Sequence, residues 1–212
     1  MFRDRDHAAG ILAGRLEKYN GSDNAVIAIP RGGAAIGFEL ARLLGLPLEL
    51  ILTHTIGHPY NREYPIGMVS LFGAVFNEDF GVDENYLRSE SESAKKALME
   101  KYFFYMPGRA PLDFKGRTVI LTDDGLASGT TMLPVIEMLI RDKASEIIVA
   151  VPVASECAVK KIRSYVNVMI YCLTIPDNFY AVNQVYENFE NVSDEEAVRL
   201  LRLANEMFAG SK

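Results

Sequence analysis

The sequence predicts an α/β fold in which a parallel sheet carries helices on both faces. Short apolar runs typical of buried strands alternate with longer segments whose apolar residues recur at helical spacing. Within residues 25–53 a strand, a helix and a second strand follow one another, which implies a right-handed crossover between parallel strands. Hydrophobic residues make up 49% of the 212 residues, enough for one sizeable core, so we expect a single domain over residues 1–212.

Each element can be placed along the chain. We expect strands at residues 25–30, 47–53, 117–122, 146–152 and 167–174. We expect helices at residues 34–45, 83–105, 131–140, 155–165 and 192–208, and a first helix whose apolar face comprises Ala8, Ile11, Leu12, Leu16 and Tyr19. Ser193 and Glu196 form a predicted capping box. Residues 54–66 hold two prolines and are predicted to be a loop, and residues 68–77 a hairpin.

Composition narrows the classes of partner. The net charge of −6 argues against binding to nucleic acid or to membrane surfaces. No apolar run reaches the roughly 18 residues of a spanning helix, and residues 1–12 are too charged for a signal peptide. Cys157 and Cys172 lack metal-type or redox-type spacing, so we expect buried free thiols and a cytoplasmic protein.

The strongest candidate site is the segment VILTDDGLASGTT at residues 119–131. An apolar strand runs into Asp123 and Asp124, which places both acids at the carboxyl end of the sheet, where such folds bind ligands. The loop that follows consists of small and hydroxylated residues, namely Ala127, Ser128, Gly129, Thr130 and Thr131. Because it opens a helix, its N–H groups suit a phosphate. The carboxylates suit hydroxyls or Mg²⁺. A sugar phosphate would therefore match both the acids, through its hydroxyls, and the loop, through its phosphate.

An ordinary strand–turn–helix junction, with the aspartates capping the helix, is the alternative for this segment. One capping aspartate would be common in such a junction. Two adjacent acids at a strand end, followed by five small residues, are less so. The pattern therefore favours the binding site.

The segment resembles the signature of the type I phosphoribosyltransferases, with Thr122 and Gly125 where an aliphatic and a branched residue are usual. More closely, the chain resembles the uncharacterised "predicted phosphoribosyltransferase" group of that superfamily. The resemblance covers nearly the whole chain, in blocks such as IPRGGAAIGFELARLLGLPLEL, IGHPYNREYPIGMV and FYAVNQVYENFENVSDEE. It implies a phosphoribosyltransferase-like parallel-sheet fold with a small hood or flap region.

The resemblance also implies roles for these residues. In such enzymes an acceptor displaces pyrophosphate from C1 of phosphoribosyl pyrophosphate (PRPP) through an oxocarbenium-like transition state. Asp123 and Asp124 would hold the ribose hydroxyls, directly or through Mg²⁺, and residues 127–131 would hold the 5-phosphate. The position of the pyrophosphate loop, which often contains a non-proline cis peptide, is taken by Pro30, Arg31, Gly32 and Gly33. There the glycines open the backbone and Arg31 offers a guanidinium fork, although a plain strand–helix turn is the alternative.

Two further segments have roles implied by the resemblance. Residues 55–66 match the mobile loop that closes over the reacting centre, where we expect Arg62 to act beside Tyr60 and Tyr64; a surface loop without a role is the alternative. The acceptor pocket often lies after the last strand. The aromatic residues there either stack on a flat acceptor or belong to the core, and they are Phe179, Tyr180 and Tyr186.

Two departures from the family pattern bear on function. Purine salvage enzymes for 6-oxopurines carry an acid where this chain has Ala127, which argues against hypoxanthine or guanine as acceptor. Members of the group that the chain resembles tend to have an arginine–lysine pair near the position where this chain has Thr53, His54 and Thr55, which implies a weaker grip on pyrophosphate.

The leading hypothesis is a Mg²⁺-dependent phosphoribosyltransferase, a pentosyltransferase of nucleotide metabolism, that uses PRPP and an unidentified nitrogenous acceptor. A homodimer is a candidate assembly. The main alternative is a PRPP-binding or nucleotide-binding regulatory protein that has kept the site and lost the chemistry. A phosphohydrolase is less favoured because the sequence reveals no nucleophile–base pair.

Overall fold

The computed structural model describes residues 1–21, 23–76, 81–108 and 110–210. Its centre is a parallel five-stranded sheet in the order β2-β1-β6-β7-β8. These strands are β1 (Ala25–Ala28), β2 (Leu48–Leu50), β6 (Thr118–Thr122), β7 (Glu146–Val153) and β8 (Val168–Thr174). All five lie within or against the predicted strand segments, which confirms the predicted α/β fold.

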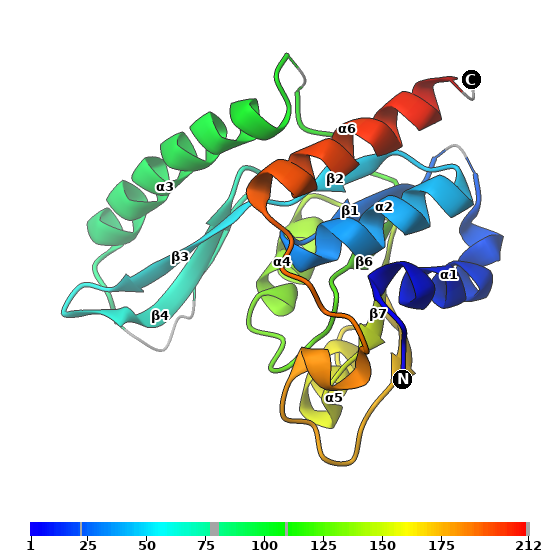
Figure 1. Cartoon of the computed structure of the whole chain (residues 1–212). Helices are drawn as coiled ribbons and strands as arrows, with labels where there is room; N and C mark the ends of the chain where they lie inside the picture. Colours follow the sequence, from blue (N-terminus) through cyan, green and yellow to red (C-terminus); the bar gives the residue numbers. More distant parts are fainter. Residues whose placement is uncertain (22, 77–80, 109, 211–212) are drawn as a thin grey trace.

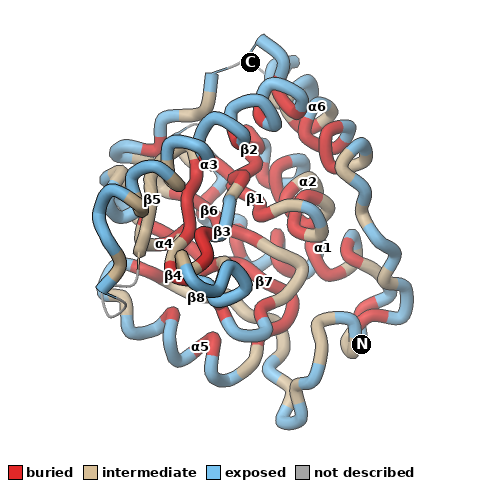
Figure 2. The backbone as a smooth tube through the Cα atoms, turned by 90° about the vertical axis from the view of Figure 1, so that its left-hand side faces the viewer, coloured by how far each residue is buried: buried red, intermediate tan, exposed pale blue. Residues whose placement is uncertain are grey.

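Helices cover both faces of this sheet (Figure 1). Alternate strand residues point to opposite faces, so Val26 and Ile120 pack against α1 (Arg5–Leu16), α2 (Gly32–Leu44) and α6 (Asp194–Gly210). Their neighbours Ile27 and Leu121 pack against α4 (Met132–Arg141) and α5 (Glu156–Arg163). Figure 2 shows the buried residues gathered along the central strands and the inward sides of these helices.

Local interactions fix where these helices begin and end. The Asp4 side chain accepts from the His7 N–H at the start of α1, and Ser155 caps α5 through the Ala158 N–H. Gly45 ends α2 with a left-handed φ of 65°, which glycine adopts without steric cost. Among the described residues, no helix combines the length and apolarity needed to cross a membrane.

The prediction of a loop at residues 54–66 is wrong, because this segment forms a β-hairpin. β3 (Thr53–His58) and β4 (Asn61–Ser70) pair antiparallel, and β5 (Ala74–Phe76) extends them to a second, three-stranded sheet. The register shifts at Gly57, which lies opposite Pro65. Proline has no N–H to donate and is tolerated at such irregularities. A Cβ on Gly57 would lie 2.1 Å from the Arg62 carbonyl oxygen, so the close pairing needs glycine.

The hairpin and α3 (Glu84–Tyr105) project together from the central sheet (Figure 1). The Tyr86 hydroxyl donates to the Gly57 carbonyl oxygen at 2.8 Å, which joins the two elements. The predicted hairpin at residues 68–77 is confirmed as the β4–β5 pair up to Phe76, and Asn77 lies outside the described residues. This projecting unit corresponds to the expected flap.

Three local predictions are wrong. Ile11 lies on the exposed side of α1. Cys157 is exposed and Cys172 is half-buried. At α6 the Ser193 hydroxyl accepts from the Glu196 N–H at 3.1 Å, but the Glu196 carboxylate binds Arg199 rather than the Ser193 N–H. The predicted capping box is therefore only half formed, because a guanidinium is a stronger partner for a carboxylate than a neutral N–H.

Candidate active site

Two loops meet at the carboxyl edge of the central sheet. β1 and β6 are parallel neighbours with Ala28 opposite Thr122, so the loops that follow them emerge side by side. A Cβ on Gly32 would lie 1.9 Å from Asp124 Oδ2, and one on Gly33 would lie 3.0 Å from the Asp123 Cα. Only residues without side chains permit this approach. The peptide bond between Pro30 and Arg31 is cis, as the family resemblance led us to expect.

Asp123 is half-buried at the end of β6. Its Oδ1 accepts from the Asp124 N–H at 2.8 Å, and the Gly33 N–H also bonds to it. Burial, together with the adjacent charge of Asp124, raises the pKa of Asp123 well above its usual value. A group that bonds to this carboxylate and favours its charged form, such as a hydroxyl or a cation, would oppose that rise.

Asp124 is held by residues from both ends of the chain. Arg5 donates to Asp124 Oδ2 from Nε at 2.9 Å and from Nη2 at 2.8 Å. Only 10% of the Arg5 side chain and 15% of the Asp124 side chain are exposed. The Tyr186 hydroxyl donates to the Asp124 carbonyl oxygen at 2.8 Å. Both the side chain and the backbone of Asp124 are therefore fixed from behind.

The loop at residues 127–131 presents free hydrogen-bond donors beside these acids. Gly129 has a φ of 78°, which turns the chain into α4, and the Leu133 N–H bonds back to the Gly129 carbonyl oxygen. The backbone N–H groups that donate to no acceptor among the described residues are those of Ala127, Ser128, Gly129 and Thr131. The Ser128 and Thr130 hydroxyls lie 3.0 Å apart. Free donors at a helix N-terminus suit an anion.

Neighbouring elements hold this loop. The Ser155 hydroxyl donates to the Ala127 carbonyl oxygen at 2.5 Å, and Lys161 Nζ lies 3.5 Å from the Ser128 carbonyl oxygen. Carbonyl groups are thus turned toward α5 and its cap. The loop is anchored to the sheet through the Leu126 N–H, which bonds to the Val153 carbonyl oxygen.

Arg31 and Arg62, the two predicted catalytic residues, occupy different surroundings. Arg31 precedes α2, is exposed, and forms no ion pair among the described residues. Arg62 lies on β4, and its exposed side chain binds Glu90 of α3, with Nη2 and Oε1 3.2 Å apart. Its guanidinium also lies 5.5 Å from the centre of the Tyr86 ring. Arg62 is therefore directed toward α3 in this conformation, and the structure does not bring it to the aspartates.

A cavity of about 760 Å³ separates the hairpin from the loop at residues 127–131. Thr55 and Glu63 line it from the hairpin, while Thr130, Thr131 and Arg141 line it from the loop and α4. Thr53, His54 and Thr55 form the start of β3 and provide no permanently charged side chain. The side of the cavity formed by β3 therefore lacks the basic pair that the family resemblance led us to expect.

The three aromatic residues proposed for the acceptor pocket are not equivalent. Tyr186 is buried and packs between Phe2 and Phe189, at ring-centre distances of 5.7 and 5.1 Å. Burial, and then the charge of Asp124, raises its pKa. Tyr186 therefore belongs to the core, one of the two roles that the sequence analysis allowed for it, and not to an acceptor pocket. Phe179 is half-buried and Tyr180 is 79% exposed, so only these two have surface to offer a ligand.

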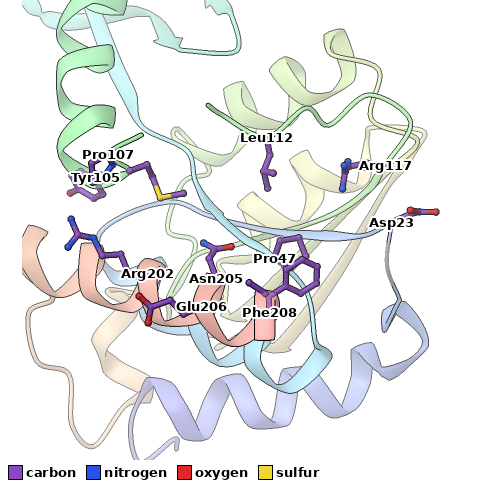
Figure 3. Close-up of a pocket in the computed structure, with 12 residues that line it drawn as sticks. Asp23, Pro47, Tyr105, Pro107, Leu112, Arg117, Arg202, Asn205, Glu206 and Phe208 are labelled. Carbon is purple, nitrogen blue, oxygen red and sulfur yellow. The ribbon is translucent and has the colours of Figure 1, made fainter. Parts of the chain in front are cut away.

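A second cavity of about 750 Å³ lies away from these loops. It opens between α6 and the connector after α3, and Pro47, Leu112 and Phe208 contribute to its apolar wall (Figure 3). Pro47 and Arg117 immediately precede β2 and β6, which places this cavity at the amino ends of the strands. It is more apolar than the cavity beside residues 127–131. Neither Asp123 nor Asp124 lines it, and neither do the N–H donors of residues 127–131.

Asp123 and Asp124 are the residues that would hold a Mg²⁺ ion if one binds together with a substrate. Carboxylate oxygens are suitable ligands, and Mg²⁺ is usually bound by one or two carboxylates together with substrate phosphates and water. Arg5 occupies only Oδ2 of Asp124, so Asp124 Oδ1 accepts from no donor among the described residues. The same residues contain no cluster of three or more histidine, cysteine or acidic side chains that could hold a metal without substrate.

Sequence reasoning missed Arg5. The residue stands in a charged N-terminal segment, 119 positions from Asp124, and no local pattern connects the two. Among the described residues, however, Arg5 and Glu49 are the charged residues that are buried. The burial of Arg5 depends on a pairing across the whole fold, which a reading of neighbouring residues does not reveal.

Comparison with known families gives one match over most of the chain. The model for the phosphoribosyl transferase domain matches residues 4–190. This span begins one residue before α1 and ends at Glu190, so it includes Arg5, both loops and the segment around Tyr186.

Two curated relatives from strains of Mycobacterium tuberculosis carry the name "Putative phosphoribosyl transferase". Each is 32% identical over 215 aligned positions, covering 99% of this chain and 48% of the relative. The chain thus spans about half the length of these curated relatives.

Solved structures show the same fold. TT1426 from Thermus thermophilus superposes with a TM-score of 0.82 at 32% identity, covering 94% of this chain and 97% of that one. A hypothetical protein from Neisseria gonorrhoeae, solved with bound ppGpp, gives a TM-score of 0.52 at 16% identity. The alignment covers 96% of this chain and 98% of that one. At this identity the similarity shows the fold alone.

Proposed function

The chain belongs to the phosphoribosyl transferase domain family, and on that premise we propose that it transfers the phosphoribosyl group of PRPP to a nitrogenous acceptor and releases pyrophosphate. The contact of Gly32 with Asp124 is the observation that carries this proposal. This contact brings the loop at residues 30–33, with its exposed Arg31, against Asp123 and Asp124. The N–H donors of residues 127–131 lie beside them. These are three neighbouring recognition elements, and PRPP has a diphosphate, a diol and a 5-phosphate to match them.

Each element has one task in this proposal. The N–H groups of residues 127–131 hold the 5-phosphate, and Asp123 and Asp124 accept hydrogen bonds from the ribose hydroxyls. Arg31 donates to the diphosphate oxygens. As the C1–O bond breaks, its electron pair leaves with pyrophosphate. A lone pair of the acceptor nitrogen forms the new bond to C1, and that nitrogen then loses its proton to solvent. Mg²⁺ bound by the aspartates and the diphosphate would neutralise part of the leaving-group charge.

The exposed Ala127 restricts the acceptor. Its methyl group can neither accept nor share a proton with a ring nitrogen of a 6-oxopurine. Phe179 and Tyr180, after β8, are the remaining aromatic candidates for stacking on a flat acceptor. We therefore expect neither hypoxanthine nor guanine to be a substrate.

A second candidate function is favoured by the position of Arg62. Its guanidinium binds Glu90, and β3 provides no permanent positive charge. A protein with this arrangement could bind PRPP or a nucleotide as a signal without catalysing transfer. Ground-state binding would then survive although the leaving group is poorly stabilised.

Pyrophosphate release from PRPP and Mg²⁺ with a panel of nitrogenous acceptors distinguishes the two functions. Transfer predicts release that depends on one acceptor and is lost in Asp123→Asn, whereas hypoxanthine and guanine give none. Binding without release for every acceptor would support the regulatory function. Turnover of hypoxanthine or guanine near the ordinary value of about 10 per second would contradict the role given to Ala127.

A further inference from the structure

Arg5 connects the N-terminal helix to the acidic pair and to the C-terminal segment. Besides its two bonds to Asp124 Oδ2, it donates from Nη1 to the Glu190 carbonyl oxygen at 2.7 Å. Its guanidinium carbon lies 3.8 Å from the centre of the Phe189 ring. The remaining direct contact of the segment with Asp124 is the Tyr186 hydroxyl on the backbone oxygen. Arg5 and Tyr186 thus both bond to Asp124, and Glu190 and Phe189 in turn hold Arg5.

We infer that Arg5 is a positioning residue for Asp124, and that the N-terminal helix is thereby part of the sugar-phosphate site. This inference rests on the proposed function. Arg5 bonds only to Oδ2 and leaves Asp124 Oδ1 without a recorded donor among the described residues. The guanidinium thus sets the rotation of the carboxylate and determines which oxygen is available to a ribose hydroxyl or to Mg²⁺.

The contacts of Arg5 explain why an arginine suits this position. The aromatic ring on one face and the carbonyl oxygen at Nη1 fix the plane of the guanidinium, and the two remaining donors converge on Oδ2. A lysine ammonium is a point charge and cannot reproduce this planar set of donors. Because both side chains are largely buried, loss of either partner leaves an unpaired charge.

The position of Asp124 also affects the other loop. Asp124 Oδ2, the oxygen that Arg5 holds, is the atom closest to the space above Gly32. Rotation of the carboxylate would therefore change the surface against which the loop at residues 30–33 packs. Through Asp124, Arg5 influences the relative positions of the acids and of the proposed diphosphate loop.

A structural tie between the two ends of the chain is the competing explanation. Backbone bonds already join these ends, from the Phe2 N–H to the Val185 carbonyl oxygen and from the Asn188 N–H to the Arg3 carbonyl oxygen. A merely structural Arg5 would affect folding stability, and would affect ligand affinity equally whether or not residue 124 carries a charge. A double-mutant cycle separates these cases.

The test compares PRPP affinity, measured calorimetrically with Mg²⁺, in Arg5→Gln, Asp124→Asn and the double variant. We expect Arg5→Gln to weaken binding by roughly 10- to 100-fold, as substitutions of residues that orient a ligand-binding group commonly do. In the Asp124→Asn background the same substitution should cost less than about twofold. Arg5→Lys should restore part of the affinity, and Arg15→Gln, an exposed control on the same helix, should leave it unchanged. Equal losses in both backgrounds, or a lower melting temperature with unchanged affinity, would overturn the inference.

A readout without ligand keeps this inference separate from the proposed function. Failure of the wild-type chain to bind PRPP would contradict the proposed function alone. Hydrogen exchange of residues 119–131 then tests Arg5: faster exchange in folded Arg5→Lys than in Arg15→Gln supports positioning, and equal exchange contradicts it. Arg5→Lys keeps the buried charge and therefore serves where Arg5→Gln fails to fold.

Discussion

The two halves of the candidate site are built on different kinds of structure. Residues 123–131 follow a central strand, and Arg5 and Tyr186 fix Asp124 from behind. The diphosphate half depends on Arg31, which is exposed, and on a hairpin whose Arg62 binds Glu90 of α3. The half with the aspartates is supported by the core of the sheet. In the proposed diphosphate half, the guanidinium of Arg62 is directed toward α3 and away from the aspartates.

This difference separates ground-state binding from turnover. The ribose hydroxyls and the 5-phosphate form and break no bond in the reaction, so we expect the sheet-supported half to contribute mainly to ground-state binding. Negative charge builds on pyrophosphate only as the C1–O bond breaks, and donors placed there act mainly in the transition state. We therefore expect the site to bind PRPP better than it turns it over.

The largest effect should come from Gly32→Ala, which breaks the contact between the two halves. The added Cβ would lie 1.9 Å from Asp124 Oδ2, and Arg5 prevents the carboxylate from moving aside freely. We expect PRPP affinity to fall by more than about 100-fold, measured by calorimetry. Gly10→Ala on α1, where a Cβ would meet nothing within 4 Å, is the matched control. Normal affinity in Gly32→Ala would show that the loops can separate without consequence.

Single substitutions of the acids should have the next largest effect. Asp123→Asn removes a charge that burial already disfavours, and we expect roughly a 10- to 100-fold loss of PRPP affinity with little loss of stability. Asp124→Asn should lose affinity and also lower the free energy of unfolding, because it leaves buried Arg5 unpaired. Thermal unfolding and calorimetry on both variants provide the test. An unchanged affinity in both would exclude a role in binding ribose or metal.

The diphosphate half should respond in rate rather than affinity. Glu90→Gln releases Arg62, and Thr55→Lys adds a charge facing the cavity, so each should raise pyrophosphate release up to about tenfold with little change in PRPP affinity. Arg62→Ala should abolish the gain from Glu90→Gln. Glu92→Gln, at an exposed position on α3, is the control. A wild-type rate in the ordinary range that none of these variants alters would place the leaving group elsewhere.

The smallest effect concerns folding stability at alkaline pH, through Tyr165, whose hydroxyl bonds to Glu137 on the helix that follows the loop at residues 127–131. Burial, followed by the hydrogen bond to Glu137, raises the pKa of Tyr165 to about 12. The folded chain holds this proton more tightly than the unfolded chain, whose tyrosines titrate near a pKa of about 10. The resulting stability is full below about pH 10 and is lost as the pH rises through about 12.

Chemical denaturation over that range checks this prediction. The difference in unfolding free energy between wild type and Tyr165→Phe should shrink as the pH rises, whereas Tyr180→Phe, at an exposed site, should show a constant difference. A constant difference for Tyr165→Phe as well would contradict the assignment.

Local patterns in the sequence were sufficient for the sheet-supported half. Apolar runs located every central strand, and the acids with their small-residue loop followed β6 as predicted. The hairpin was missed because its pairing depends on a register shift at Gly57 and Pro65, and a proline in isolation indicates a loop. Arg5 was missed, and the choice between core and acceptor pocket for Tyr186 stayed open, because both depend on contacts between distant parts of the chain. A single domain over residues 1–212, a cytoplasmic location and a homodimer stay predictions.

Separate titrations of ribose 5-phosphate and of pyrophosphate, each with Mg²⁺, test the contrast between the halves most directly. In the proposed arrangement ribose 5-phosphate engages the aspartates and the loop at residues 127–131. Pyrophosphate engages the loop at residues 30–33 and the hairpin, and reaches the aspartates only through Mg²⁺. We expect ribose 5-phosphate to retain most of the affinity for PRPP and pyrophosphate to bind at least about tenfold more weakly, a difference of about 1.4 kcal/mol. Pyrophosphate binding tighter than ribose 5-phosphate would contradict the account, because the affinity would then lie in the half that we describe as weak.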